Sequence, residues 1–136
     1  MGVSLMPYSP LAAGHLTRPV WNADTLRSRT DRVAMGKYDR TDEQDMQIVV
    51  RVHALAEKYG VKMQQIALAW HWAKGVASPI VGATKAQYLG DAAGALNVKR
   101  TDEDIAYLEE PYISHRIVGT IDHNPADGVM LLDGKK

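Results

Sequence analysis

The chain has 136 residues, enough for one domain with a substantial buried core and short for two. Its composition, 46% hydrophobic and 24% charged, is that of a folded globular protein and excludes a disordered or collagen-like chain. Sixteen basic residues balance sixteen acidic ones, so the net charge favours binding neither to nucleic acid nor to an anionic membrane. Cysteine is absent, which excludes disulfides, cysteine catalysis and cysteine-based zinc sites.

The N-terminal third of the sequence combines one short apolar run with a long polar stretch. Residues 3–8 predict a short strand that ends at Pro10. Residues 9–41 lack apolar periodicity and predict a long loop, of a kind that is usually functional or mobile. Its arginines could contact a phosphate, but the interleaved aspartates also fit a solvated loop. No apolar run nears the roughly 20 residues of a membrane helix, and residues 1–10 lack the basic region of a signal peptide, so we expect a cytoplasmic protein.

The middle of the chain predicts helices. Thr41 and Gln44 have the spacing of a capping box, and the apolar residues that follow recur on one face of a helix over 41–59, which Gly60 ends. Residues 63–74 predict a helix that is apolar nearly all round and therefore packed on more than one side. We expect Trp70 to lie in the core.

The rest of the sequence continues the alternation of strands and helices. The predicted elements are a buried strand, two helices and a possible strand in the tail: 77–83, 85–96, 101–109 and 129–132. The order of the elements predicts an α/β fold with two parallel strands and four helices. The five histidines show no metal-ligand spacing, so no metal site is expected, and we interpret His53 and His71 as helix-flank residues.

Two segments have the composition of anion-binding turns. Residues 8–14 combine a hydroxyl with small residues after the first strand, and Gly82, Thr84 and Lys85 stand between the second strand and a helix. Backbone N–H groups, the positive end of a helix and a lysine all favour phosphate. The two sites together suggest a dinucleotide, although ordinary strand-to-helix turns with a capping threonine have the same pattern.

These residues also carry a resemblance to a known family. The run Pro7-Tyr-Ser-Pro-Leu-Ala-Ala-Gly14 resembles barrel strand seven and its loop in the aldo-keto reductases. Residues 66–70 are similar to the helix before strand eight, and residues 78–85 and 101–103 resemble strand eight and the start of a later helix. The similarity extends over residues 2–119 in order. It implies an NADP(H)-dependent reductase of aldehydes or ketones, built on a (β/α)8 barrel.

The resemblance also implies which residues hold the cofactor. Tyr8 would stack on the nicotinamide. Independently of the resemblance, Arg18 or a neighbour in the loop at 18–40 could contact the 2′-phosphate, although a solvated loop is the first interpretation of that segment. The pyrophosphate would be held by Ser9, Pro10, Leu11, Ala13 and Gly14. The adenosine 2′-phosphate would be held by Gly82, Thr84 and Lys85, with Tyr88 and Asp91 lining the adenine. Tyr88 and Ala92 depart from the residues that many family members have there.

The family's catalytic Asp, Tyr, Lys and His precede the matched region, so the resemblance implies no catalytic residue here. We expect residues 1–112 to be the cofactor-side segment of a partial (β/α)8 barrel, which takes roughly 250 residues when complete, followed by a tail at 113–136. We expect the chain alone to be inactive and to self-associate or to be completed by another chain that brings the carbonyl substrate site. The alternative is a non-catalytic nucleotide-binding or packing module.

Overall fold

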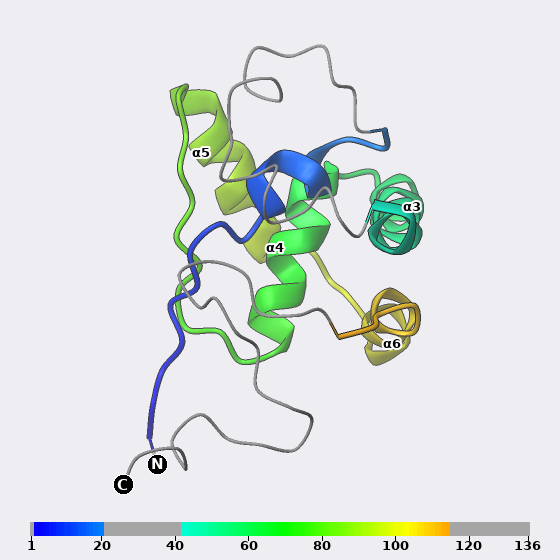
Figure 1. Cartoon of the computed structure of the whole chain (residues 1–136). Coiled ribbons are helices and arrows are strands. Elements are labelled where there is room, and N and C mark those ends of the chain that lie inside the picture. The colour runs from blue at the N-terminus through cyan, green and yellow to red at the C-terminus, as the bar shows by residue number, and fades with distance from the viewer. Residues whose placement is uncertain (1, 21–41, 115–136) are drawn as a thin grey trace, which may run out of the picture.

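The computed structural model describes residues 2–20 and 42–114, and its helices surround one central helix (Figure 1). The elements are a 3-10 helix η1, the α-helices α3, α4 and α5, a 3-10 helix η2 and the α-helix α6: Ala12–Thr17, Asp42–Tyr59, Met63–Ala73, Ala86–Ala93, Gly94–Asn97 and Asp102–Glu109. Helix α4 lies in the middle, with α3 and α6 on one side and the extended segments and α5 on the other. The predicted set of four α-helices is therefore present.

The segments 3–8 and 77–83 form a single parallel bridge and not a sheet. The prediction of two strands was therefore wrong for the described residues. Tyr8 pairs with Ile80. The Ile80 N–H donates to the Pro7 carbonyl over 2.9 Å, and the Ala77 N–H donates to the Leu5 carbonyl over 3.1 Å. A pair of parallel strands is poorly stable without neighbouring strands and covered faces, and the described residues contain no further strand beside it.

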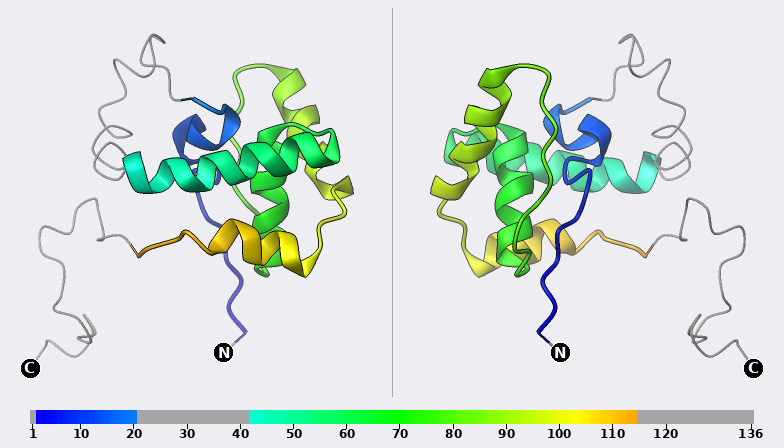
Figure 2. Two further views of the ribbon diagram at one scale, coloured as in Figure 1. Left: turned by 90° about the vertical axis from the view of Figure 1, so that its right-hand side faces the viewer. Right: turned by 90° about the vertical axis from the view of Figure 1, so that its left-hand side faces the viewer.

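The larger part of the core lies where α3 and α6 cross α4. In Figure 2, α3 and α6 lie side by side, run in opposite directions and cross the central helix. Val49 and Val52 of α3 meet Ile66 of α4 and Leu108 of α6 there, each at most 6% exposed. The predicted apolar face of the 41–59 helix is thus the face that packs.

A second, smaller core lies on the other side of α4. Leu68 is fully buried against Ala92 and Ala95, and Leu11 and Val81 pack onto this cluster. Helix α4 therefore has a buried surface toward both sides, as its nearly continuous apolar sequence predicts. Val81 of the second extended segment packs onto this side of α4, and so does Leu11, which follows the first extended segment.

The ends of the helices follow local sequence signals. Gly60 and Gly75 take positive φ values of 62° and 76° after α3 and α4, a conformation that costs glycine little. Thr101 caps α6 by accepting the Asp104 N–H over 3.2 Å. The predicted helix over 85–96 ends instead at Ala93 and continues as η2. Thr41 and the possible strand at 129–132 lie outside the described residues.

Candidate functional site

The parallel bridge brings together the two turns that the sequence suggests for anion binding. We call residues 9–14 the first loop and residues 82–85 the second loop. Because the paired segments run in the same direction, the loops that follow them leave from the same edge. Figure 1 shows η1 and the start of α5 at that end of the molecule. The predicted binding segments are thus neighbours in the fold, although about 70 residues separate them in the sequence.

The first loop has an unusual backbone. Ser9, Ala12 and Ala13 take φ values of 58°, 48° and 54°, and Gly14 takes 101°. A left-handed conformation costs a residue with a Cβ of order 1 kcal/mol, and such residues cluster at functional sites. The loop is closed on itself, because the Ala12 N–H donates to the Ser9 carbonyl over 3.0 Å and the Ala13 N–H to Ser9 Oγ over 3.2 Å. The first loop is therefore a strained turn held by hydrogen bonds.

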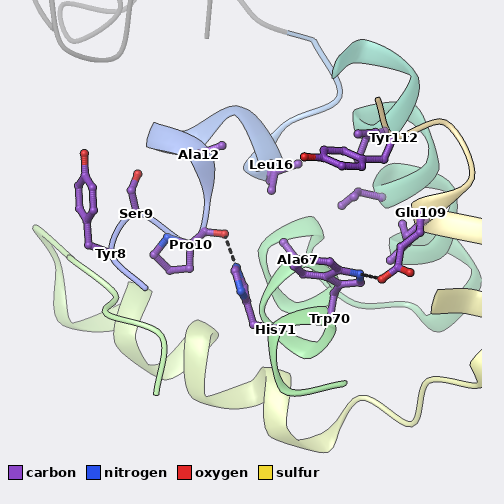
Figure 3. A pocket seen from close by; sticks show the side chains of 13 residues that line it. Tyr8, Ser9, Pro10, Ala12, Leu16, Ala67, Trp70, His71, Glu109 and Tyr112 are labelled. Carbon is purple, nitrogen blue, oxygen red and sulfur yellow. Dashed lines mark hydrogen bonds between the residues drawn. The ribbon is translucent and has the colours of Figure 1, made fainter. Parts of the chain in front are cut away.

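The predicted residues of the first loop divide into two groups. Pro10 is buried, and Leu11 is half-buried against the second core cluster, so their side chains anchor the loop. Tyr8 is 64% exposed and its ring points away from α4 in Figure 3. The Arg18 guanidinium lies 3.7 Å from the position a Cβ would take on Gly14, which puts a positive charge beside the turn.

The second loop is open to solvent. Gly82, Thr84 and Lys85 are exposed, and Lys85 is the N-cap of α5 without a side-chain capping bond. Its Nζ lies 5.9 Å from the centre of the Tyr88 ring. A lysine beside the first turn of a helix adds to the positive potential of the helix N-terminus. These three side chains are therefore accessible at the start of α5, and anion binding by the second loop stays a prediction.

Asp91 has a partner in the helical body. Lys62 Nζ lies 2.5 Å from its Oδ2, and the Gln65 side-chain amide donates to its carbonyl over 2.9 Å. Its neighbour Ala92 is buried in the second core cluster. The Asp91 carboxylate is thus engaged by residues at the start of α4, and its assignment to an adenine contact stays a prediction.

A cavity of about 270 Å³ lies between the first loop and helices α3, α4 and α6 (Figure 3). Leu16, Ile48, Val52 and Leu108 give it an apolar wall. Six side chains with polar atoms line it as well: Tyr8, Ser9, Trp70, His71, Glu109 and Tyr112. The sequence predicts Trp70 in the core and His71 on a helix flank, and it assigns no functional role to Glu109.

Hydrogen bonds join Trp70 to Glu109 and His71 to the first loop. The Trp70 indole N–H donates to Glu109 Oε1 over 2.8 Å, and Lys74 Nζ lies 3.0 Å from the same oxygen. The hydrogen bond from Lys74, with a smaller contribution from Trp70, holds the pKa of Glu109 below its usual value against the effect of burial. His71 Nε2 lies 3.0 Å from the Pro10 carbonyl. The one sequence signal for these roles is that His71 and Lys74 are polar positions in an otherwise apolar helix.

A tyrosine, a lysine and an aspartate meet elsewhere, between α3 and α6. Tyr59 donates to Asp104 Oδ2, and Lys58 Nζ donates to Oδ1 over 2.7 Å. The hydrogen bond to Asp104, together with burial, raises the pKa of Tyr59. A tyrosine that serves as a general acid needs a lowered pKa instead. We therefore interpret this trio as a structural connection.

Residues 2–20 and 42–114 contain no group of three or more metal-ligating side chains. Within the same ranges, none of the helices has both the length and the apolar character needed to cross a membrane.

Comparison with known proteins identifies the relatives of the chain. The sequence model of the aldo/keto reductase family matches residues 1–113. A versiconal hemiacetal acetate reductase of Aspergillus parasiticus is 42% identical over 117 residues, which cover 85% of this chain and 34% of the relative. A Schizosaccharomyces pombe protein named as a proposed aryl-alcohol dehydrogenase is 46% identical over 124 residues, 88% of this chain and 34% of the relative. The chain thus spans about a third of the length of these relatives. It belongs to the aldo/keto reductase family, a family of oxidoreductases.

Proposed function

We propose that the chain binds NADP(H) and forms the cofactor-side segment of a reductase of aldehydes or ketones. The observation that carries this proposal is the parallel pairing of Tyr8 with Ile80, because it puts the first and second loops at one edge. Positive side chains accompany both loops, Arg18 at the first and Lys85 at the second. A dinucleotide with phosphates at two separate points matches that distribution of charge.

Each loop has its own part in the proposed binding. Ser9, Pro10, Leu11, Ala13 and Gly14 form a turn around the pyrophosphate, with Arg18 as the nearby cation and Tyr8 exposed to stack on the nicotinamide. Gly82, Thr84 and Lys85 form the pocket for the 2′-phosphate. Tyr88, at 39% exposure, offers a ring face to the adenine, with Asp91 three residues further along the same helix.

The proposed reaction needs more than the described residues provide. The cofactor supplies a hydride when it is bound, and this chain's residues would bind and orient it. Protonation of the carbonyl oxygen needs an acid with a lowered pKa, whereas the pKa of Tyr59 is raised. We propose that the acid and the substrate site come from a further portion of barrel, consistent with a chain that spans about a third of its relatives.

The preference between NADP and NAD tests this proposal. NADPH and NADH are titrated into the purified chain by isothermal calorimetry, with Lys85→Met as the variant and Lys99→Met, another exposed lysine, as the control. We expect NADPH to bind more tightly, and Lys85→Met to cost about 1–3 kcal/mol of NADPH binding, the value of a charged hydrogen bond. NADH affinity and the Lys99→Met variant should be little changed.

Equal titration curves for the two nucleotides, unaffected by Lys85→Met, would contradict the assignment of the 2′-phosphate site. The same samples test catalysis. With a reactive aldehyde, NADPH oxidation should match the rate without protein, because positioning alone replaces neither the acid nor its partners. A turnover of about 1 s⁻¹ or more that Tyr8→Phe abolishes would show that this chain contains its own acid.

A further inference from the structure

The first loop has a conformation that its own sequence does not favour. Three of its residues with a Cβ are left-handed, and its hydrogen bonds from Ala12, Ala13 and Gly14 all go to acceptors within the loop. Strained backbone persists where surrounding structure determines it. A contact from outside the loop is therefore needed to select this conformation.

His71 provides such a contact. Its Nε2 lies 3.0 Å from the carbonyl oxygen of Pro10, a residue 61 positions earlier and the second of the first loop. Figure 3 shows the imidazole directed from α4 toward that carbonyl. A carbonyl oxygen only accepts, so the proton must be on Nε2 for the bond to form. Pro10 has no N–H of its own, which leaves its carbonyl as the backbone group that fixes this position.

The imidazole is itself held in place. The rings of Trp70 and His71 meet edge to face, with centroids 5.2 Å apart and an angle of 73° between the planes. Trp70 donates to Glu109, which Lys74 also binds. A connected series of side chains thus runs from α6 through α4 to the first loop.

We propose that His71 is a positioning residue for cofactor binding. By donating from Nε2 to the Pro10 carbonyl, it holds the first loop in the left-handed conformation that receives the pyrophosphate. It acts through the loop and does not touch the cofactor. The effect on cofactor binding rests on the proposed function. The hydrogen bond between His71 and the first loop can be measured without any nucleotide.

The test uses two substitutions and a matched control. His71→Leu removes the donor, and His71→Gln retains an N–H at a similar distance from the backbone. The control is His53→Leu on α3, whose imidazole lies 3.6 Å from Glu57. Three quantities are measured: amide hydrogen exchange at Ala12, Ala13 and Gly14, the tautomer of His71 by nitrogen NMR at a pH where it is neutral, and the dissociation constant for NADPH.

We expect the Nε2–H tautomer in the unsubstituted protein. In His71→Leu, exchange of the three loop amides should rise about fivefold, the typical effect of one hydrogen bond, and the NADPH dissociation constant should rise by a similar factor. His71→Gln should restore both, and His53→Leu should alter neither. Amides of α4 at residues 67–69 should be unchanged in all variants.

Three results would overturn the inference: an Nδ1–H tautomer, loop exchange equal in His71→Leu and the unsubstituted protein, or an equal rise in the loop and in α4. The tautomer requires no substitution, so the inference stays testable even if a variant fails to fold. If the unsubstituted protein does not bind NADPH, the proposed function fails, while the exchange and tautomer results still decide whether His71 holds the loop.

Discussion

Asp104 is the buried charged residue among those described, and it joins two helices. It is 4% exposed, and its carboxylate accepts hydrogen bonds from Lys58, Tyr59 and the Thr101 N–H. Burial by itself raises the pKa of a carboxylic acid, but these donors outweigh it, and the pKa of Asp104 is held well below its usual range. The end of α3 is thereby fixed to the start of α6.

We predict that Asp104→Asn destabilises the fold by about 2 kcal/mol at pH 7, because a neutral amide cannot accept all of these bonds and its N–H₂ group faces donors. The free energy of unfolding from urea titrations measures the effect. Asp102→Asn, the same substitution at an exposed position of the same turn, is the control and should change stability little. A loss of the same size in both variants would show that local charge, and not the buried network, is responsible.

The same residue gives a pH prediction. Because the pKa of Asp104 is lower in the folded state, its contribution to stability is complete above the unfolded value of about 3.9 and is lost as pH falls from there toward the folded value. Below pH 4, the free energy of unfolding of the unsubstituted protein should therefore approach that of the Asp104→Asn variant. The difference should shrink by up to about 1.4 kcal/mol per pH unit. A stability difference that stays constant between pH 7 and 3 would contradict the lowered pKa.

Among the elements, the junction of α5 and η2 depends on a glycine for space. Gly94 has helical φ and ψ values of −58° and −21°, yet a Cβ there would lie 2.2 Å from Gln65 Nε2. Gln65 cannot move freely, because its amide donates to the Asp91 carbonyl and accepts the Lys62 N–H over 2.9 Å. Close approach of α4 and η2 therefore requires the small residue.

We predict that the sign of the Gly94→Ala effect depends on Gln65. When Gln65 is present, the new methyl group displaces the Gln65 side-chain amide. The free energy of unfolding should then fall by about 1–2 kcal/mol, the value of two hydrogen bonds less the gain from replacing glycine in a helix. In a Gln65→Ala background the same change should stabilise by up to about 1 kcal/mol. Gly90→Ala, with nothing within 4 Å of its Cβ position, should stabilise in both backgrounds. Thermal unfolding of the four-member cycle measures this, and equal effects in both backgrounds would disprove the coupling.

The helices could be predicted from sequence because their signals are local. Apolar spacing in α3, continuous apolarity in α4 and the threonine cap of α6 each lie within one element. Whether the extended segments form a sheet could not be predicted in the same way, because a strand exists only with a partner. Residues 3–8 have one bridge, at Tyr8. The role of His71 was missed for a similar reason: its acceptor is a backbone carbonyl 61 residues away, for which no side-chain pattern exists.

For the molecule as a whole, the pair of extended segments has an uncovered apolar surface. Val3, Leu5, Met6 and Ile80 are 51–75% exposed. The hydrogen bonds described for this pair join the carbonyls of residues 5 and 7 to the second segment. Exposed apolar side chains along extended backbone recruit other chains.

We therefore predict that the chain self-associates through this surface at micromolar concentrations. Leu5→Lys should weaken association, because a charge on an apolar contact surface must be desolvated when the contact forms. Val50→Lys, at a residue 56% exposed on α3 and far from the extended pair in sequence, should leave association unchanged. Sedimentation equilibrium of the three proteins gives the association constants, and hydrogen exchange at Ala77 and Ile80 reports whether the pairing is stable. A 15.0 kDa monomer with strongly protected amides at both positions would show that the two segments close a stable fold without a partner, and the interpretation as part of a barrel would then be wrong.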